Sequence, residues 1–427
     1  MKDPIIIIGA GISGLSASYF LKKKNIVLEA NLCAGGLCRS FYEDGFTFDC
    51  SGHFIHIRDQ KIKTFVNKLS GGLEKINRDA AIFLKNNFIP FPFQANLYYL
   101  DEKIKKECID GILKRKDIKI DNKMPFIDWS LSMFGKGITK YFMEPYNKKL
   151  WSYDLKKMNA QWTGQFVPKP EAKEIIESAY SKNRSAYGYN SVFYYPKSGG
   201  CQALIDGFLQ KVKPIMNART KKIDIKNKIV YTDFYSYKYC KIISTQPIVE
   251  LIKQISNVPP KVKEAAKKLK FSNVRCVNIG IKSKNGIPAI LKNKHWIYMP
   301  EPSLPFYRVG IYSNVNKNMS PKNSYSFYIE FSSQNNEYKK SANVINDLKK
   351  IGFISKTDEI ASINVVDMPY AYVIFDANKD KALKIINEFL NSNNIYSIGR
   401  YGAWEYSFIE KNIQDAKAAA DIINREK

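Results

Sequence analysis

The sequence lacks long hydrophobic runs. None of its apolar stretches approaches the roughly 18 residues that a membrane-spanning helix needs, and the first of them, residues 5–8, ends at a glycine turn. That pattern differs from a secretory signal peptide, whose longer apolar region is followed by a cleavage site. We therefore expect no transmembrane segment and predict a cytoplasmic protein.

Histidine and cysteine are scarce, with three histidines and seven cysteines in 427 residues. No two cysteines are spaced as Cys-x-x-Cys, and no cysteine–histidine cluster has the spacing of a zinc site. His53 and His56 lie three residues apart, but no third metal ligand is evident nearby. We predict free thiols in a reducing compartment and no metal centre.

Acidic residues are also few: 40 Asp and Glu stand against 67 Lys and Arg, for a formal net charge of +27. Such an excess suits nucleic acid, an acidic membrane surface or a phosphorylated substrate. The lysine pairs are spread along the whole chain, and no arginine-rich or RNA-binding motif is present. We therefore favour a solvated lysine-rich surface and expect no nucleic acid partner, while an anionic substrate remains compatible.

The N-terminal segment carries the strongest motif. Residues 5–8 read as a strand buried in a parallel sheet, and Gly9, Gly11 and Gly14 follow as Gly-x-Gly-x-x-Gly before a helical segment. Glu29 ends the next strand about 20 positions after the first glycine, where a carboxylate can accept hydrogen bonds from ribose hydroxyls. The segment predicts dinucleotide binding; the alternative is a glycine-rich turn without a ligand.

A glycine pair further along the chain narrows the choice of cofactor. Gly35 and Gly36 come just after the acidic residue, and Arg39 follows them, which is the pattern of large FAD enzymes. The glycines let the backbone pass the cofactor phosphates, and the arginine can pair with one of them. We therefore predict FAD rather than NAD.

The remaining chain predicts two further parts. Residues 97–155 read mainly as helices, whereas residues 274–282, 296–299, 307–313, 325–331 and 371–375 read as strands, several with alternating apolar and polar residues. The expected fold class is α/β, with a Rossmann-like FAD-binding domain, a helical domain and an antiparallel β-sheet substrate domain. The expected boundaries are 1–90, about 187–265 and 390–427 for a discontinuous FAD-binding domain, about 96–170 for the helical domain, and about 270–385 for the sheet.

These segments, in this order, resemble the UDP-galactopyranose mutases, especially the eukaryotic type, within the superfamily of amine oxidase and protoporphyrinogen oxidase-like flavoproteins. The resemblance runs nearly end to end, through residues 9–14, 35–36, 52–53, 92–96, 145–151, 189–196, 296–298, 305–314 and 399–406. It implies that the enzyme interconverts pyranose and furanose forms of a nucleotide-diphosphate sugar, with reduced FAD acting covalently through N5 and no net redox change. A homo-oligomer is compatible with the sequence.

The resemblance also assigns residues. Arg308 and Tyr406 match contacts to the diphosphate, and His53 belongs to a histidine loop, so these three are the candidate catalytic residues. Additional candidates for cofactor binding are Gly52, Asn190, Gly399 and Arg400. Additional candidates to line the cleft that binds the nucleotide and the sugar next to the flavin are Gln94, Asn147, Trp151, Gln165, Trp296 and Tyr298.

One position departs from the family. Gln165 stands where the family has a second arginine, and Lys169 is a nearby candidate to replace that charge. Losing one charged contact to a diphosphate costs on the order of 1.5–3 kcal/mol in a desolvated site. An FAD-dependent oxidoreductase therefore stays open as an alternative, as does a flavoprotein without catalysis or a scaffold in a cell-envelope polysaccharide pathway.

Overall fold

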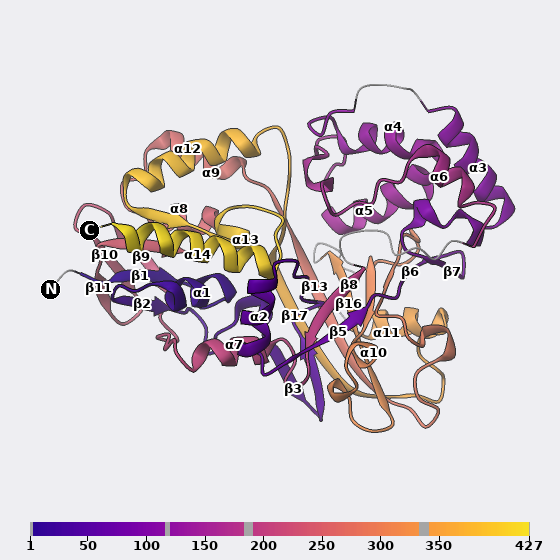
Figure 1. Ribbon diagram of the computed structural model, residues 1–427, viewed down its shortest axis with the longest axis horizontal. Coiled ribbons are helices and arrows are strands. Elements are labelled where there is room, and N and C mark those ends of the chain that lie inside the picture. The colour runs from indigo at the N-terminus through magenta and orange to yellow at the C-terminus, as the bar shows by residue number, and fades with distance from the viewer. Residues whose placement is uncertain (1–2, 116–119, 183–190, 333–340, 427) are drawn as a thin grey trace.

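The computed structural model describes residues 3–115, 120–182, 191–332 and 341–426. Figure 1 shows a parallel sheet with its helices at one end of the molecule, a group of helices at the other end, and a large antiparallel sheet beside and below that group. Both chain termini lie at the end that carries the parallel sheet. Among the described residues, none of the helices has the length and apolar character required to cross a bilayer.

The parallel sheet has four strands in the order β18-β12-β1-β2. Their bounds are Ile395–Ser397, Lys241–Ser244, Ile5–Ile8 and Asn25–Leu28, respectively. Helices α1 (Ile12–Phe20) and α14 (Ile409–Arg425) pack against each other beside it, and α2 (Gln60–Leu69) packs on α7 (Gln202–Leu209). The four isoleucines of β1 are almost completely buried, as expected for a central strand that is covered on both faces.

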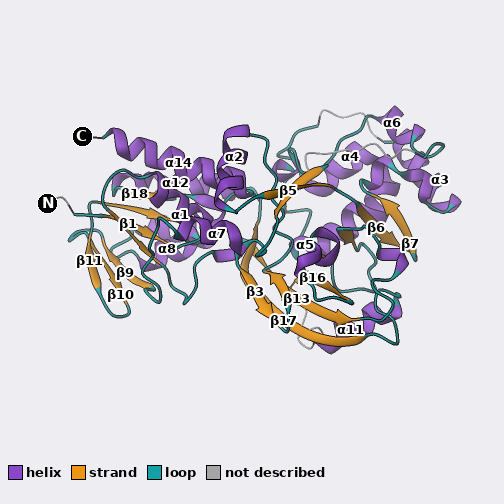
Figure 2. Ribbon diagram, turned by 60° about the horizontal axis from the view of Figure 1, so that its bottom comes forward, coloured by secondary structure: helices purple, strands orange, loops and turns teal. Residues whose placement is uncertain are grey.

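A small antiparallel sheet joins this part at its outer end. It consists of β9 (Thr220–Asp224), β10 (Ile229–Thr232) and β11 (Ser236–Lys238), paired in the order β11-β10-β9. Helices α8 (Ile248–Gln254), α9 (Pro260–Lys268) and α12 (Lys379–Ser392) share one hydrophobic core with it. Figure 2 shows these strands at the same end as the two termini.

The large sheet has seven strands in the order β17-β13-β16-β15-β14-β6-β7. Their bounds are Glu359–Val373, Phe271–Lys282, Ser324–Ser332, Arg308–Ile311, Trp296–Tyr298, Ala80–Leu84 and Asn87–Pro90, respectively. Every pairing is antiparallel except that between β14 and β6. Short two-stranded sheets, β3 (Ser40–Glu43) with β4 (Phe46–Asp49) and β5 (Leu73–Asn77) with β8 (Val192–Pro196), connect it to the dinucleotide-binding part. Helices α10 (Tyr312–Val315) and α11 (Ser341–Lys350) complete it.

The helical part consists of α3 (Glu102–Leu113), α4 (Phe126–Ile138), α5 (Glu144–Trp151) and α6 (Ala172–Glu177), with a π-helical turn over Thr139–Met143. Helices α3 and α4 cross closely because Gly111, Gly135 and Gly137 lie at the crossing. A Cβ atom on any of the three would approach backbone of the other helix to less than 3 Å. Helix α5 faces the large sheet, so its inner side chains contribute to the space between the two parts.

The predicted fold class is confirmed: the chain is α/β, with a Rossmann-like unit, helices and antiparallel sheets. Two details differ from expectation. Strands β6 and β7 belong to the large sheet, although residues 1–90 were assigned to the FAD-binding domain, because β6 pairs with β14. Strand β17 spans 15 residues, whereas only its last part was predicted. The domain boundaries themselves remain predictions.

Candidate active site

The first glycine turn has the geometry of a phosphate-binding turn. Gly9 has φ +101°, and a Cβ on Gly14 would lie 1.9 Å from the carbonyl oxygen of Gly9. Helix α1 begins directly after Gly11, and no side chain caps it. The unpaired N–H groups and positive dipole of this helix end can therefore bind a pyrophosphate that approaches the bare glycine backbone.

Glu29 lies at the end of β2, and its side chain is buried. One carboxylate oxygen accepts the Ala10 backbone N–H at 2.8 Å, and the other accepts the backbone and side-chain N–H groups of Asn31 at 2.9 and 2.8 Å. The carboxylate is thus fixed next to the glycine turn, and its oxygens can still accept a further hydrogen bond. This placement agrees with the predicted ribose contact.

Replacing Gly14 by alanine is expected to expel most of the bound flavin. The new methyl group requires the glycine turn to move, and overpacking of this kind costs roughly 1–3 kcal/mol. The measurement is the ratio of flavin to protein absorbance after purification and after reconstitution with FAD. Gly286→Asn is the matched control, since nothing lies within 4 Å of its Cβ and asparagine tolerates its φ of +70°. Equal flavin content in both variants would contradict the assignment.

Two further glycine segments close around the first turn. Gly35 and Gly36 have φ +119° and +57°, and the Gly35 N–H donates to Ala10 O at 2.8 Å. Near the C-terminus, Gly399 has φ +79°, and a Cβ there would lie 2.4 Å from Ser13 Oγ at the start of α1. Arg39 donates to Gly36 O at 3.2 Å and is partly exposed. Three distant segments therefore meet at one helix N-terminus, and this cradle fits a dinucleotide such as FAD.

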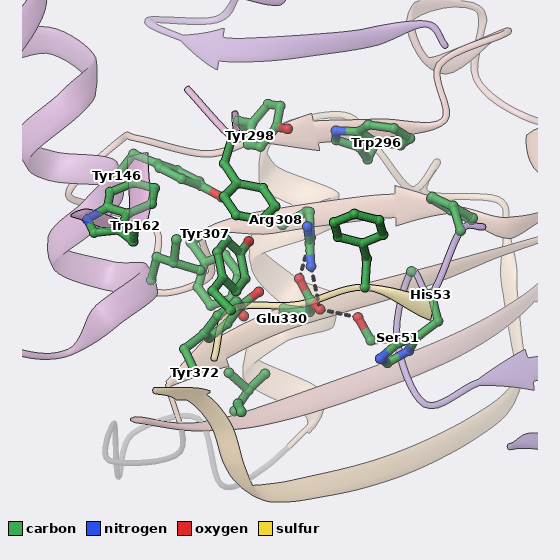
Figure 3. Close-up of a pocket in the computed structure, with 18 of the residues that line it drawn as sticks. Ser51, His53, Tyr146, Trp162, Trp296, Tyr298, Tyr307, Arg308, Glu330 and Tyr372 are labelled. Carbon is green, nitrogen blue, oxygen red and sulfur yellow. Dashed lines mark hydrogen bonds and ion pairs between the residues drawn. The ribbon is translucent and has the colours of Figure 1, made fainter. Parts of the chain in front are cut away.

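A cavity of about 250 Å³ lies between the large sheet, α5 and the turn after β18. Figure 3 shows its aromatic wall together with one ion pair. Among the predicted site residues, the cavity is lined by Gly52, His53, Gln94, Asn147, Trp296, Tyr298, Arg308, Arg400 and Tyr406. Nearly all of the predicted catalytic and substrate contacts thus meet in one space, although they come from six separate segments of the chain.

Arg308, on β15, is the charged group in the cavity wall next to α5. Its Nη2 donates to Glu330 Oε1 at 2.8 Å, and its Nε donates to Glu330 Oε2. Ser51 Oγ also donates to Glu330, whose side chain is only 3% exposed. The bidentate edge of the guanidinium is therefore occupied by protein, and Nη1 has no partner among the described residues. A diphosphate contact by Arg308, as predicted, would therefore involve Nη1 and not the bidentate edge.

A second arginine supports the opposite wall. Arg400 donates to the carbonyl oxygens of Ser407 and Ala371 at 2.6 and 3.0 Å, and its guanidinium lies 4.9 Å from the centre of the Tyr406 ring. Burial raises the pKa of Tyr406 and Tyr372, so both phenols stay protonated at neutral pH and can donate hydrogen bonds. This wall offers neutral donors to an anionic ligand.

Several polar atoms in the cavity wall are buried and find no hydrogen-bond partner among the residues that the structure describes. They include His53 Nδ1, Gln94 Oε1, Trp162 Nε1 and Trp296 Nε1. A buried polar group without a partner costs about 1–3 kcal/mol, and such groups are a feature of sites that bind a polar ligand. The wall therefore fits a ligand with several hydrogen-bonding groups, such as a sugar, a nucleotide or a flavin ring.

Some predicted residues lie elsewhere. Trp151, the last residue of α5, is completely buried and donates its indole N–H to Asn147 one turn earlier in the same helix at 2.9 Å, and it does not line the cavity. Gln165 is exposed and does not line the cavity, and neither does Lys169, which is also exposed. Gly52, by contrast, does line the cavity, beside Tyr328, and a Cβ there would lie 2.2 Å from the Tyr328 hydroxyl. Asn190 lies outside the described residues.

Three residues that organise this region could not be identified from the sequence. Glu330 accepts the two hydrogen bonds of Arg308, and Ser51 donates to Glu330. Asp49 is fully buried and accepts hydrogen bonds from Tyr195, Ser40 and the Cys201 backbone at 2.7, 2.6 and 3.1 Å. Within the described ranges, no three His, Cys, Asp or Glu side chains group as metal ligands.

All three histidines are held neutral by burial, which predicts acid sensitivity. Desolvation lowers the pKa of His56 and of His295 from 6.5 to about 4, and it also lowers the pKa of His53. The unfolded chain therefore binds more protons below pH 6.5, so stability is full above that pH and is lost as pH falls towards 4. At pH 5, each of His56 and His295 is expected to cost about 2 kcal/mol.

The variant His295→Asn isolates one of these contributions. His295 Nδ1 accepts the Asp79 N–H at 2.9 Å, and an asparagine oxygen can replace that acceptor without titrating. Urea unfolding at pH 7 and pH 5 should show a smaller loss of stability in the variant than in the unmodified protein. An identical loss in both proteins would contradict the role of this histidine.

Comparisons with known proteins fit this geometry. The NAD(P)-binding Rossmann-like domain family matches residues 7–69. A crystal structure of reduced UDP-galactopyranose mutase superposes with a TM-score of 0.93 at 26% identity, covering 99% of this chain and 95% of the other. The chain has the fold of the UDP-galactopyranose mutases. The mutase resemblance indicated by the sequence motifs is thereby confirmed.

More distant matches include oxidases and a reductase. A putative protoporphyrinogen oxidase from Exiguobacterium superposes with a TM-score of 0.77 at 17% identity over the full length of both chains, which shows the fold alone. An inactive all-trans-retinol 13,14-reductase from Danio rerio is 48% identical over 54 residues, which cover 12% of this chain and only 9% of that relative. A coproporphyrinogen III oxidase from Staphylococcus aureus is 33% identical over 101 residues, 22% of each chain. These matches support a flavin-dependent enzyme of the oxidoreductase and isomerase superfamily.

Proposed function

We propose that the protein is a flavin-dependent nucleotide-sugar mutase that interconverts pyranose and furanose forms of a UDP-galactose-like substrate. The observation that carries this proposal is the superposition on reduced UDP-galactopyranose mutase over nearly the whole of both chains. The reduced state of FAD, a cytoplasmic location and a role in cell-envelope polysaccharide synthesis belong to the same proposal.

The residues around the cavity suit the demands of that reaction. Reduced FAD, when bound, supplies a nucleophilic nitrogen and needs no external oxidant for an isomerisation. In the proposal, Arg308 Nη1 and the hydroxyl of Tyr406 hold the diphosphate group as it leaves and returns. Because Glu330 balances most of the arginine charge, this grip is weaker than that of a bare cation, and the diphosphate can be released at the end of turnover.

The aromatic wall has a second role in this proposal. Tyr298 stacks on Phe91 with ring centres 4.9 Å apart and meets the edge of Tyr146 at 5.3 Å. Trp296 stacks on Phe54 at 5.3 Å. Such a wall offers flat apolar faces to a sugar or a base and keeps water away from the anomeric carbon, where water would hydrolyse the substrate.

The alternative is an FAD-dependent oxidoreductase of the amine oxidase or protoporphyrinogen oxidase type. It is favoured by the sequence relatives, which are retinol reductases and a coproporphyrinogen oxidase, and by the absence of an arginine at Gln165. In that reaction the substrate loses two hydrogens to the flavin, and the cavity needs no diphosphate contact.

One incubation separates the two functions. Protein reduced with dithionite under anaerobic conditions is mixed with UDP-galactopyranose or its N-acetylated analogue, and the products are resolved by chromatography and mass. We expect a new nucleotide sugar of unchanged mass. A product lighter by two hydrogens, or no product from any nucleotide sugar, would contradict the mutase proposal.

A further inference from the structure

The tip of the hairpin between β10 and β11 exposes two aromatic side chains. Phe234 and Tyr235 are each 69% exposed, among the most exposed large hydrophobic residues of the described chain. Most of the described aromatic side chains pack against neighbours, and the apolar side chains on the inner face of this sheet are buried as well. Ile223 and Val230 are fully buried there, in the core shared with α8. The tip residues therefore contribute little to the fold itself.

The backbone of the tip is well held. The Thr232 N–H and hydroxyl both donate to Tyr235 O, at 2.8 and 2.9 Å, and the Tyr235 N–H donates back to the Thr232 hydroxyl at 3.0 Å. Three hydrogen bonds thus close residues 232–235 into a turn that holds its two aromatic side chains in water. Preorganisation of this kind lowers the entropy lost when the side chains become buried in a partner.

The surrounding charge is positive. The sheet carries two acidic residues, and both are occupied locally: Asp233 pairs with Lys221 at 2.9 Å, while Asp224 accepts N–H groups from Lys226 and Asn227. Lys222 lies across from Tyr231, with its ammonium 5.7 Å from the ring centre. Arg219, Lys226, Lys228 and Lys238 are also exposed. Arg219 and Lys222 lie at the end of the sheet that carries the aromatic tip. Lys226, Lys228 and Lys238 lie towards its other end. The net positive charge is therefore spread over the sheet, with two of its cations near the tip.

The hairpin between β10 and β11 lies away from the cavity of the candidate active site. Figures 1 and 2 both show β9, β10 and β11 at the end of the molecule that carries the chain termini, at the opposite end from helices α3, α4 and α6. None of the residues of this sheet lines the cavity. A partner bound at the tip would not cover the candidate active site.

We propose that this hairpin docks the protein on an anionic lipid bilayer, with Phe234 and Tyr235 inserted at the headgroup level. Aromatic side chains favour the interface of a bilayer, and lysines close to its surface are attracted by anionic headgroups. Nucleic acid fits less well, because the patch is rich in lysine and contains a single arginine. The attraction is peripheral and reversible, since only two side chains reach the hydrocarbon boundary.

The test is sedimentation of the flavin-loaded protein with vesicles. Vesicles of phosphatidylcholine with 30% phosphatidylserine are compared with pure phosphatidylcholine at about 0.15 M salt. The test variant is Phe234→Ser with Tyr235→Ser, and Lys222→Ser tests the charge. The matched controls are Tyr180→Ser, whose ring is 72% exposed in the helical part, and Lys349→Ser on α11. Flavin content and activity on soluble substrate should be unchanged in every variant.

The expected result is binding to the anionic vesicles only, lost in the aromatic variant, weakened roughly fivefold by Lys222→Ser and unaffected in both controls. Equal binding by the aromatic variant would overturn the proposal, as would the absence of vesicle binding by the unmodified protein. Binding of a DNA duplex that the same variants abolish, without any affinity for vesicles, would also overturn it and would indicate a nucleic acid partner.

Discussion

Replacing Arg308 by alanine is expected to lower kcat/KM for the nucleotide sugar by about 10²-fold or more, equivalent to at least ~2.7 kcal/mol. The loss should appear in kcat as well as in binding, because a fixed charge is worth most where the leaving group develops negative charge. Arg308→Lys should restore only part of the activity, since an ammonium cannot contact Glu330 with two parallel donors and still reach the substrate.

Arg275→Ala is the matched control for this experiment. Arg275 lies on β13 of the same sheet and pairs with Asp367 through two hydrogen bonds of 2.6 and 2.7 Å, but it does not line the cavity. UDP affinity of each variant is measured by titration of the flavin absorbance. If Arg308→Ala binds UDP as tightly as Arg275→Ala does, the arginine is not a diphosphate contact, and the case for a nucleotide-sugar substrate is lost.

Replacing Glu330 by alanine is expected to destabilise the folded protein by about 3–5 kcal/mol, because it leaves a partly buried guanidinium without its counter-charge. Glu330→Gln should cost less, since an amide keeps one acceptor for Arg308 at the same place. The double variant Arg308→Ala with Glu330→Ala should lose less stability than the sum of the two single variants, because neither charge is then left alone.

Urea unfolding of the flavin-loaded protein at pH 7 measures the free energy of unfolding of each variant: Glu330→Ala, Glu330→Gln, Arg308→Ala and the double alanine variant. A Glu330→Ala variant as stable as the unmodified protein would show that Arg308 does not need this carboxylate. Additive losses in the double variant would show that the two side chains are not coupled, in conflict with the bidentate contact in the structure.

Much of the dinucleotide-binding unit could be predicted because its signals are local. Gly9, Gly11 and Gly14 with Glu29 lie within 21 consecutive residues, and strand, turn and helix are each specified by neighbouring side chains. Gly399, by contrast, was assigned through the family resemblance of residues 399–406. The fold class followed from the same local periodicities.

The charge arrangement at the cavity was not predictable in this way. Ser51 and Glu330 are 279 positions apart in the sequence, and they meet only because β16 and the segment after β4 pack together. An isolated glutamate within an apolar strand gave no indication of its partner. The direction of a side chain is equally non-local. Motif position placed Gln165 and Trp151 in the cleft, whereas Gln165 is exposed to solvent and Trp151, at the end of α5, is buried in the core.

The consumption of reductant tests the mutase account most directly. Protein is reduced anaerobically with a known, small amount of dithionite, and a large excess of UDP-galactopyranose is added. The amount of converted sugar is then compared with the number of electrons supplied, while the flavin absorbance is followed. The account predicts many turnovers per reduced flavin, with the flavin still reduced at the end and no conversion by the oxidised protein. Product formation that matches flavin reoxidation or reduction one for one would contradict it and establish an oxidoreductase.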